Sequence, residues 1–208
     1  YCIQLYHHVA NAVSLKDSKV LEVGSGRGGG SYYITRYLGP KTVVGVDFSE
    51  KAVAFCNHNY SLDGLSFVTA DAELLPFEDN SFDVVVNIES SHCYGSMDAF
   101  LREVKRVLRQ DGYFLYADLR GKDKVETLYK QLYRSGMTLT KATNITPNVL
   151  EALDLDNERK TAIIRQSMNK LLLNTFQEFA GVKGSAIYEG FRAGDLVYLS
   201  FVLQKREE

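Results

Sequence analysis

The sequence is poor in three features that would each point to a class of protein: paired cysteines, surplus positive charge and long apolar runs. Its three cysteines, Cys2, Cys56 and Cys93, are odd in number and widely spaced, so they build neither a disulfide framework nor a zinc ribbon. The 24 Lys and Arg residues are balanced by 26 Asp and Glu residues, which leaves no basic surplus for a nucleic-acid backbone. No apolar run approaches the roughly 20 residues that a membrane-spanning helix needs. We therefore expect a soluble, cytoplasmic protein that binds no nucleic acid.

The composition is that of a single folded domain. The 208 residues are 45% hydrophobic and 24% charged, which suffices to bury one core at roughly 150 residues per domain. Residue 1 is Tyr, and no charged-then-apolar signal pattern follows it. We therefore expect the numbering to begin inside a longer chain.

Short apolar runs alternate with helical patterns through the first two thirds of the chain. The run Phe82–Ile88 is almost continuously apolar, which is typical of a strand with helices on both faces of a parallel sheet. The pattern predicts a Rossmann-like, doubly wound α/β sheet of seven strands, with the last strand antiparallel. The predicted strands are 19–23, 42–46, 65–70, 82–88, 112–119, 138–146 and 196–203, and the predicted helices are 31–38, 50–60, 97–109 and 122–135.

The region after Pro147 departs from this alternation. Apolar residues recur there at helical spacing as far as about Ala180, with no strand between them. The pattern predicts a helical cap over residues 147–181, inserted between the sixth and seventh strands. Its apolar stripe consists of Ile163, Ile164, Met168, Leu171, Leu172, Phe176 and Phe179.

A glycine-rich segment follows the first predicted strand. Gly24, Gly26 and Gly29 satisfy the spacing G-x-G-x-x-G between a strand and a helix. Glycine lets a backbone approach a ligand closely, and the helix start offers unpaired N–H groups. A nucleotide-like ligand is expected here, although the spacing alone does not separate a dinucleotide from other adenosine-containing cofactors.

Acidic residues end the next two strands. Asp47 follows the second strand about twenty residues beyond the glycines, where a carboxylate can accept both hydroxyls of a ribose. Ser49 is the better candidate for the N-cap of the helix that begins at Glu50. Asp71 follows the third strand and can accept a hydrogen bond from an adenine amino group. The sequence thus predicts an adenosine site.

Two features favour S-adenosylmethionine over a nicotinamide cofactor. Glu22 precedes the glycines where nicotinamide-binding loops usually carry a small or apolar residue, and its carboxylate suits a cationic, amino-acid-bearing ligand. A short-chain dehydrogenase would need a Tyr-x-x-x-Lys pair. The only match, Tyr37 to Lys41, is interrupted by Gly39 and Pro40 and is misplaced for hydride transfer.

Five segments together resemble a class I S-adenosylmethionine-dependent methyltransferase, over about residues 18–120. Later segments around Asn87–Tyr94, Tyr116–Arg120 and Gly181–Ser185 resemble small-molecule O-methyltransferases of polyketide and lipid pathways, notably the phthiotriolone and phenolphthiotriolone dimycocerosate methyltransferases of mycobacteria. The five segments are Glu-Val-Gly-Ser-Gly-Arg-Gly (22–28), Val-Asp-Phe-Ser (46–49), Ala-Asp-Ala-Glu-Leu-Leu-Pro-Phe (70–77), Ser-Phe-Asp-Val-Val (81–85) and Glu-Val-Lys-Arg-Val-Leu-Arg-Gln-Asp-Gly (103–112).

The resemblance implies one methyltransferase domain over residues 1–208, with residues 1–18 as part of an N-terminal lid. It also implies that S-adenosylmethionine is bound and S-adenosylhomocysteine released. The glycine loop and Asn87 would hold the methionine part of the cofactor, and Asp47 would bind the ribose. Phe48 would lie against the face of the adenine, with Asp71 and Ala72 at its edge. The cofactor-binding residues expected are Glu22, Gly24, Ser25, Gly26, Gly28, Asp47, Phe48, Asp71, Ala72 and Asn87.

Transfer of a methyl group to a hydroxyl also requires removal of the hydroxyl proton. His92 follows the fourth strand, at the edge of the sheet where the methyl group should emerge, and imidazole is the usual general base at neutral pH. Glu89 can orient the imidazole or act as the base itself. An acidic phenol or enol would need little more than positioning, in which case His92 only shapes the pocket. No metal-ligand spacing surrounds His92 and Cys93, so no metal is expected.

The preferred function is O-methylation of a hydrophobic small molecule, because an apolar cap lining would suit a large lipid or polyketide alcohol. Carbon methylation, as in quinone biosynthesis, remains open, since the cofactor motifs do not report on the acceptor. Two further functions compete with these: a methyltransferase-like binding module that does not catalyse transfer, and an NAD-dependent oxidoreductase, which Glu22 disfavours.

Overall fold

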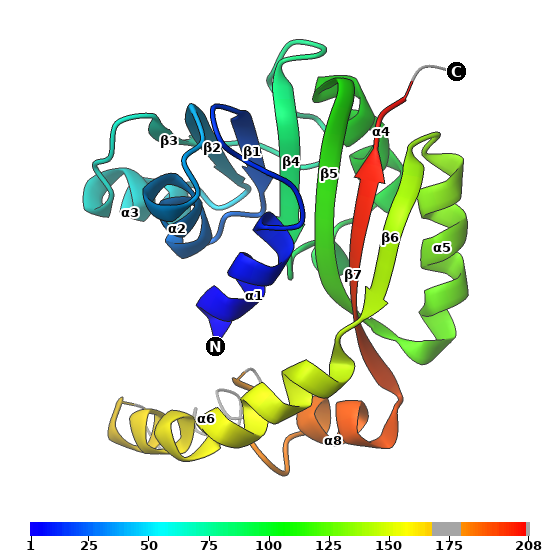
Figure 1. Ribbon diagram of the computed structural model, residues 1–208. Helices are drawn as coiled ribbons and strands as arrows, with labels where there is room; N and C mark the ends of the chain where they lie inside the picture. Colours follow the sequence, from blue (N-terminus) through cyan, green and yellow to red (C-terminus); the bar gives the residue numbers. More distant parts are fainter. Residues whose placement is uncertain (168–179, 207–208) are drawn as a thin grey trace. The chain divides into compact units, whose positions relative to one another are not determined.

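The computed structural model describes residues 1–167 and 180–206 and contains one seven-stranded sheet flanked by helices (Figure 1). Helices and strands alternate as far as β3, which leads to β4 without a helix between them; among the described residues, α6 and α8 lie between β6 and β7. The helices are α1 (Cys2–Ala10), α2 (Gly29–Tyr37), α3 (Glu50–Asn59), η1 (Ser91–Cys93), α4 (Met97–Val107), η2 (Lys122–Lys124), α5 (Val125–Arg134), α6 (Thr146–Ser167) and α8 (Ala186–Ala193). The strands are β1 (Lys19–Val23), β2 (Thr42–Asp47), β3 (Leu65–Thr69), β4 (Phe82–Ile88), β5 (Leu108–Gly121), β6 (Thr138–Asn144) and β7 (Leu196–Gln204).

The strand order is β3-β2-β1-β4-β5-β7-β6, and the strands from β3 to β5 pair in parallel. The last strand runs antiparallel to its neighbour: Asp111 N donates to Lys205 O and Lys205 N donates to Gly112 O, both at 2.9 Å. The predicted Rossmann-like, doubly wound sheet with an antiparallel last strand is thereby confirmed. The order reverses between β1 and β4, and open α/β sheets bind ligands at such a switch point.

The core of the sheet lies along β4, β5 and β7. Six of the seven residues of β4 are buried, as its near-continuous apolar run predicts. Tyr116 of β5 stacks between Phe114 and Phe201, with ring centroids 5.5 and 5.6 Å apart. Tyr129 of α5 adds an edge-on contact to Phe201. This aromatic row ties the antiparallel strand to the parallel part of the sheet.

Several local predictions differ from the structure; the sixth strand, for example, ends at Asn144 rather than at residue 146, because α6 begins at Thr146. The helix expected as far as Arg109 ends at Val107, because Leu108 already pairs with Phe82 of β4 and begins a longer β5 than expected. A further helix, α8, lies after the expected cap. Its N-cap Ser185 accepts a hydrogen bond from Tyr188 N, and Gly194 ends it with φ of 80°.

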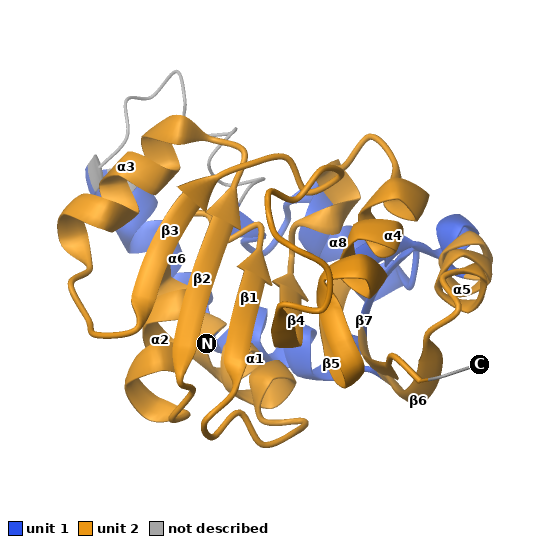
Figure 2. Cartoon of the chain, turned by 90° about the horizontal axis from the view of Figure 1, so that it is seen from above, with its two compact units in different colours: residues 1, 119–125, 144–199 blue, residues 2–118, 126–143, 200–208 orange. Residues whose placement is uncertain are grey.

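The chain divides into two compact units, coloured in Figure 2. The larger comprises residues 2–118, 126–143 and 200–208, and the smaller comprises residues 1, 119–125 and 144–199. Within the smaller unit, Asp154 of α6 accepts a hydrogen bond from Tyr188 of α8 at 2.7 Å and pairs with Lys183 at 3.0 Å. The single domain, the lid at 1–18 and the cap at 147–181 stay predictions.

The apolar stripe expected for the cap is described only in part. Ile164 is buried and Ile163 is 47% exposed. Met168, Leu171, Leu172, Phe176 and Phe179 of this stripe lie outside the described residues.

Within residues 1–167 and 180–206, no helix combines the length and apolar character needed to cross a membrane.

We predict that Phe201→Ala lowers the free energy of unfolding by about 3–5 kcal/mol, because it removes a buried ring from the aromatic row and leaves a cavity. Chemical denaturation followed by circular dichroism measures this loss. Tyr133→Ala is the control, since that ring is 86% exposed and its removal should cost less than about 0.5 kcal/mol. Equal losses in the two variants would contradict the assignment of Phe201 to the core.

Candidate active site

A cavity of about 410 Å³ opens where β1, β2, β3 and β4 end. All four are parallel strands, so their carboxyl ends meet at one edge of the sheet. The volume lies within the range of about 300–1,000 Å³ that small-molecule sites occupy. The lining residues are Val23, Gly24, Val46, Asp47, Phe48, Ala70, Asp71, Ala72, Glu73, Ser90, Cys93, Tyr94 and Gly95.

The glycine loop between β1 and α2 passes directly under the turn that follows β4. Gly24 has φ of 78°, and a Cβ atom there would lie 2.0 Å from Ser90 Oγ. Any side chain would therefore both strain the backbone and collide with Ser90. Gly24 N and Ser25 N donate to Val46 O of β2 at 2.8 and 2.9 Å, which fixes the loop against the neighbouring strand.

Asp47 sits at the end of β2 and joins the glycine loop to the start of α3. Its two carboxylate oxygens accept hydrogen bonds from Gly26 N at 2.8 Å and from Ser49 N at 2.9 Å. An ionised carboxylate offers about four lone-pair sites, so Asp47 retains acceptor capacity toward the cavity for two hydroxyls. Ser49 caps α3 through Ala52 N, as the sequence predicted.

An apolar ring and a turn flank Asp47 at the same cavity. Phe48 is 78% exposed although it is a large apolar side chain, and a flat ligand stacked on it would cover that surface. Asp71 Oδ1 accepts a hydrogen bond from Glu73 N at 2.9 Å, which closes the turn after β3. Ala72 is buried beside it. These residues form the side of the cavity where the sequence predicts adenine.

Asn87 of β4 cross-links β1 to the turn that follows β4. Its Nδ2 group donates to Val23 O at 2.8 Å and to Tyr94 Oη at 2.9 Å. Tyr94 Oη in turn lies 2.9 Å from Ser90 Oγ. Burial raises the pKa of Tyr94 well above its usual value, so the phenol stays protonated and serves as a hydrogen-bonding group.

Glu22 lies beneath the glycine loop and is fully buried. Its carboxyl accepts hydrogen bonds from Ser31 Oγ and, at 2.7 Å, from Tyr6 Oη of α1. Burial raises the pKa of Glu22 to about 7, against the lowering effect of these hydrogen bonds. Glu22 thus anchors the N-terminal helix to the first strand and does not line the cavity.

His92 stands in η1, and its imidazole is held by a buried carboxylate on the adjacent strand. His92 Nδ1 lies 2.8 Å from Asp118 Oδ1 of β5. Asp118 Oδ2 accepts hydrogen bonds from Ser91 Oγ at 2.7 Å and from His92 N at 3.0 Å, and Ser91 Oγ lies 2.9 Å from Tyr116 Oη. The Asp118 side chain is fully buried, whereas that of His92 is 33% exposed.

This contact fixes the tautomer of the imidazole. An ionised carboxylate can only accept, so Nδ1 carries the proton and Nε2 is the basic nitrogen of the neutral ring. An imidazolium formed at His92 would also lie beside the negative charge of Asp118. The pair is therefore arranged to accept a proton at Nε2.

Glu89 is placed by an unusual backbone conformation. It follows β4 with φ of 54°, a region that non-glycine residues rarely adopt, while its N–H donates to Ala117 O at 2.9 Å. Such outliers concentrate at functional sites. At His92 Nδ1 the orienting carboxylate is that of Asp118, and a catalytic role for Glu89 stays a prediction.

Two buried polar atoms near the glycine loop lack a hydrogen-bond partner among the described residues: Ser25 Oγ and Asn87 Oδ1. A buried polar atom left unsatisfied costs about 1–3 kcal/mol. Both atoms belong to residues that the sequence assigned to the methionine end of S-adenosylmethionine, which carries an ammonium and a carboxylate. Together with the acceptor capacity of Asp47 and the exposed ring of Phe48, the residues present fit this cofactor.

The structure brings together part of the expected site at the cavity: Gly24, Asp47, Phe48, Asp71 and Ala72 line it. The remaining expected residues, Glu22, Ser25, Gly26, Gly28, Asn87, Glu89 and His92, are not among its lining residues. Sequence reasoning did not single out Tyr6, Glu73, Ser90, Ser91, Tyr94, Tyr116 and Asp118. Tyr94 and Asp118 lie inside segments that carried the family resemblance, which is the signal that could have found them.

Among the described residues, no group of three or more His, Cys, Asp or Glu is placed to hold a metal ion.

Comparison with known proteins defines the class. Residues 21–116 match the family described as "Methyltransferase domain". Over 203 residues the chain is 37% identical to a phthiotriol/phenolphthiotriol dimycocerosates methyltransferase of Mycobacterium tuberculosis, covering 98% of this chain and 75% of that protein. The chain belongs to the S-adenosylmethionine-dependent methyltransferases.

A second relative agrees with this assignment, and a solved structure shares the fold. A fatty-acid O-methyltransferase of Mycolicibacterium smegmatis is 34% identical over 208 residues, all of this chain and 75% of that protein. The phosphoethanolamine N-methyltransferase 2 of Haemonchus contortus, solved with S-adenosylhomocysteine, superposes with a TM-score of 0.84 at 17% identity, covering 98% of this chain and 53% of that one. This protein is thus an enzyme that uses S-adenosylmethionine. The alternative hypothesis of an NAD-dependent oxidoreductase is not pursued further.

We predict that Asp47→Ala weakens binding of S-adenosylmethionine about 100-fold, because two hydrogen bonds to a charged acceptor are lost. Isothermal titration calorimetry measures the change. Asp63→Ala removes an exposed carboxylate outside the cavity and should bind as the unmodified protein does. Unchanged affinity in a folded Asp47→Ala variant would contradict the ribose-binding role.

From the raised pKa of Glu22 we predict that the stability of the folded protein depends on pH. Its pKa is raised from 4.5 to about 7 in the folded protein, so the neutral form is favoured there and stability falls as the pH rises between these values. The full effect is about 3 kcal/mol. Glu22→Gln lacks this ionisation, and its stability relative to the unmodified protein should rise by about that amount between pH 4 and 8. Denaturant titrations without cofactor test this, and a pH-independent difference would contradict it.

Proposed function

We propose that this methyltransferase methylates a hydroxyl oxygen of a hydrophobic small molecule, a lipid or polyketide alcohol, with His92 as the general base. The observation that carries the proposal is the contact between His92 Nδ1 and the buried Asp118 carboxylate. Proton removal is the step that a hydroxyl acceptor adds to methyl transfer. A partly exposed imidazole with its second nitrogen set as the base is suited to that step.

The names of the relatives support a lipid-type acceptor. One is called a fatty-acid O-methyltransferase and the other a phthiotriol/phenolphthiotriol dimycocerosates methyltransferase. Both align with at least 98% of this chain, so the likeness extends beyond the cofactor motifs. This supports transfer to oxygen on a lipid or polyketide.

Different residues of the chain serve cofactor binding and proton transfer. When bound, S-adenosylmethionine supplies an electrophilic methyl group on a sulfonium. Asp47 and the glycine loop bind the cofactor at the carboxyl ends of β1 and β2, and Phe48 covers the adenine. His92 Nε2 would accept the hydroxyl proton as the acceptor oxygen bonds to the methyl carbon, while the bond from that carbon to sulfur breaks and S-adenosylhomocysteine leaves. Asp118, held by Ser91 and by His92 N, keeps the ring oriented and offsets the charge of the imidazolium.

We predict that His92→Ala lowers kcat by about 100-fold or more while leaving S-adenosylmethionine affinity unchanged, because only proton removal is lost. Asp118→Asn should also lower kcat, since an amide can donate to Nδ1 and place the proton on Nε2. Transfer of labelled methyl to a panel of hexadecanol, palmitic acid and an alkyl phenol measures the rates, with product analysis by mass spectrometry. His58→Ala removes an exposed imidazole of α3 outside the cavity; it is the matched control and should keep kcat within about twofold.

A methyl ether of hexadecanol or of the alkyl phenol is the expected product. The carboxylate of palmitic acid carries no proton for His92 to remove, so formation of its methyl ester alone would contradict the proposal. Products methylated on carbon, an absence of transfer to every compound of the panel, or a His92→Ala variant with undiminished kcat would each contradict the proposal. Loss of cofactor affinity in His92→Ala equal to that in Asp47→Ala would contradict the division between binding and proton transfer.

A further inference from the structure

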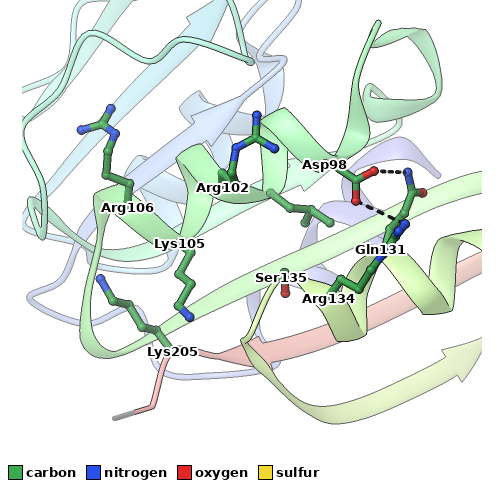
Figure 3. A pocket seen from close by; sticks show the side chains of 9 residues that line it. Asp98, Arg102, Lys105, Arg106, Gln131, Arg134, Ser135 and Lys205 are labelled. Atoms are coloured by element: carbon green, nitrogen blue, oxygen red, sulfur yellow. Dashed lines mark hydrogen bonds and ion pairs between the residues drawn. The ribbon is translucent and has the colours of Figure 1, made fainter. Parts of the chain in front are cut away.

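A second pocket of the larger unit, of about 560 Å³, lies among α4, α5 and the residue that follows β7 (Figure 3). It shares no lining residue with the active-site cavity. Five of its nine lining residues are cationic and one is acidic, in a chain whose formal net charge is −2. The lining residues are Asp98, Leu101, Arg102, Lys105, Arg106, Gln131, Arg134, Ser135 and Lys205.

Part of this positive charge is already matched by neighbouring acids. Arg106 binds the Glu103 carboxylate through Nε and Nη2 and Asp79 through Nη1 at 2.9 Å. Arg134 lies 3.6 Å from Asp98, whose other oxygen accepts from Gln131 at 3.4 Å, as the dashed lines of Figure 3 show. The positive charges of these two arginines are therefore compensated by acidic side chains of the same chain.

Arg102 and Lys205 are not matched in this way. Within the described part of the chain, Arg102 makes no hydrogen bond or ion pair, and Lys205 Nζ donates to two neutral oxygens, Asn80 Oδ1 at 2.8 Å and Leu108 O at 2.7 Å. Partial burial and the nearby Lys105 ammonium lower the pKa of Lys205. Arg102 and Lys205 thus line the pocket without a carboxylate partner among the described residues.

Helix ends do not explain the cluster. Cations in the last turn of a helix interact favourably with its dipole, which accounts for Lys105, Arg106 and Arg134. Arg102 lies in the middle of α4, and Lys205 follows a strand. Their positions facing the same pocket therefore require another reason.

We propose that this pocket binds a phosphate group carried by an organic ligand, with Arg102, Lys105 and Lys205 as its cationic contacts. A guanidinium and two ammonium groups supply the charge-assisted donors that phosphate oxygens accept. The buried Leu101 contributes apolar lining, and the volume exceeds what a phosphate alone fills, so the pocket has room for the group that bears it. The proposal is independent of the methyl acceptor and of the role of His92.

Titration with inorganic pyrophosphate at low ionic strength tests the site. We expect saturable binding to the unmodified protein, weakened about tenfold or more in the double variant Arg102→Gln, Lys105→Gln. The matched control is Arg36→Gln, Lys130→Gln, which removes the same charges from exposed positions of α2 and α5 outside the pocket. S-adenosylmethionine binding, measured on both double variants, should be unchanged and verifies that each is folded.

Vesicles separate the two sources of a phosphate group. If phosphatidylglycerol vesicles sediment the unmodified protein and not the pocket variant, while phosphatidylcholine vesicles sediment neither, the phosphate belongs to an anionic lipid headgroup. Pyrophosphate binding without vesicle binding assigns a soluble phosphate ester. Absence of saturable pyrophosphate binding, or equal weakening in the two double variants, overturns the proposal.

Discussion

The close approach of β1 to β4 is the constraint on which the site depends. A Cβ atom at Gly24 would collide with Ser90, and Asn87 of β4 donates to Val23 O of β1 and to Tyr94 Oη of the turn after β4. One small region therefore fixes both the glycine loop and the turn after β4, which carries His92. A disturbance there would move the glycine loop and His92 together, since both are anchored to the same few hydrogen bonds.

The pairing register of β4 with β5 accounts for the contact between His92 and Asp118. Asn87 lies opposite Tyr116 and Ile88 opposite Ala117, so Asp118 comes next at the carboxyl end of β5, beside the start of η1. Ser91 and the His92 backbone then complete the hydrogen bonds of the buried carboxylate. A buried carboxylate is costly unless it is hydrogen-bonded, and here its partners come from the segment that carries His92.

The sequence was sufficient for the sheet and for the cavity edge, because both follow from local patterns. Alternating apolar runs located β1 and β4 to the residue, and the strand ends located Gly24, Asp47 and Asp71. It was insufficient for contacts between strands distant in sequence. No local pattern predicts that the buried Glu22 binds Tyr6 of α1, and its role toward the cofactor stays a prediction. No local pattern places Asp118 against His92 either. The caps of α8, Ser185 and Gly194, by contrast, follow a local sequence pattern from which both ends of this helix could have been predicted.

The central claim is that Asp118 sets His92 as a base at Nε2. ¹⁵N chemical shifts of the His92 ring, assigned by comparison with His92→Ala and measured with S-adenosylhomocysteine bound, report this directly. The account predicts a protonated Nδ1 and an unprotonated Nε2 in the neutral ring. A neutral ring protonated at Nε2, with a bare Nδ1, would contradict it.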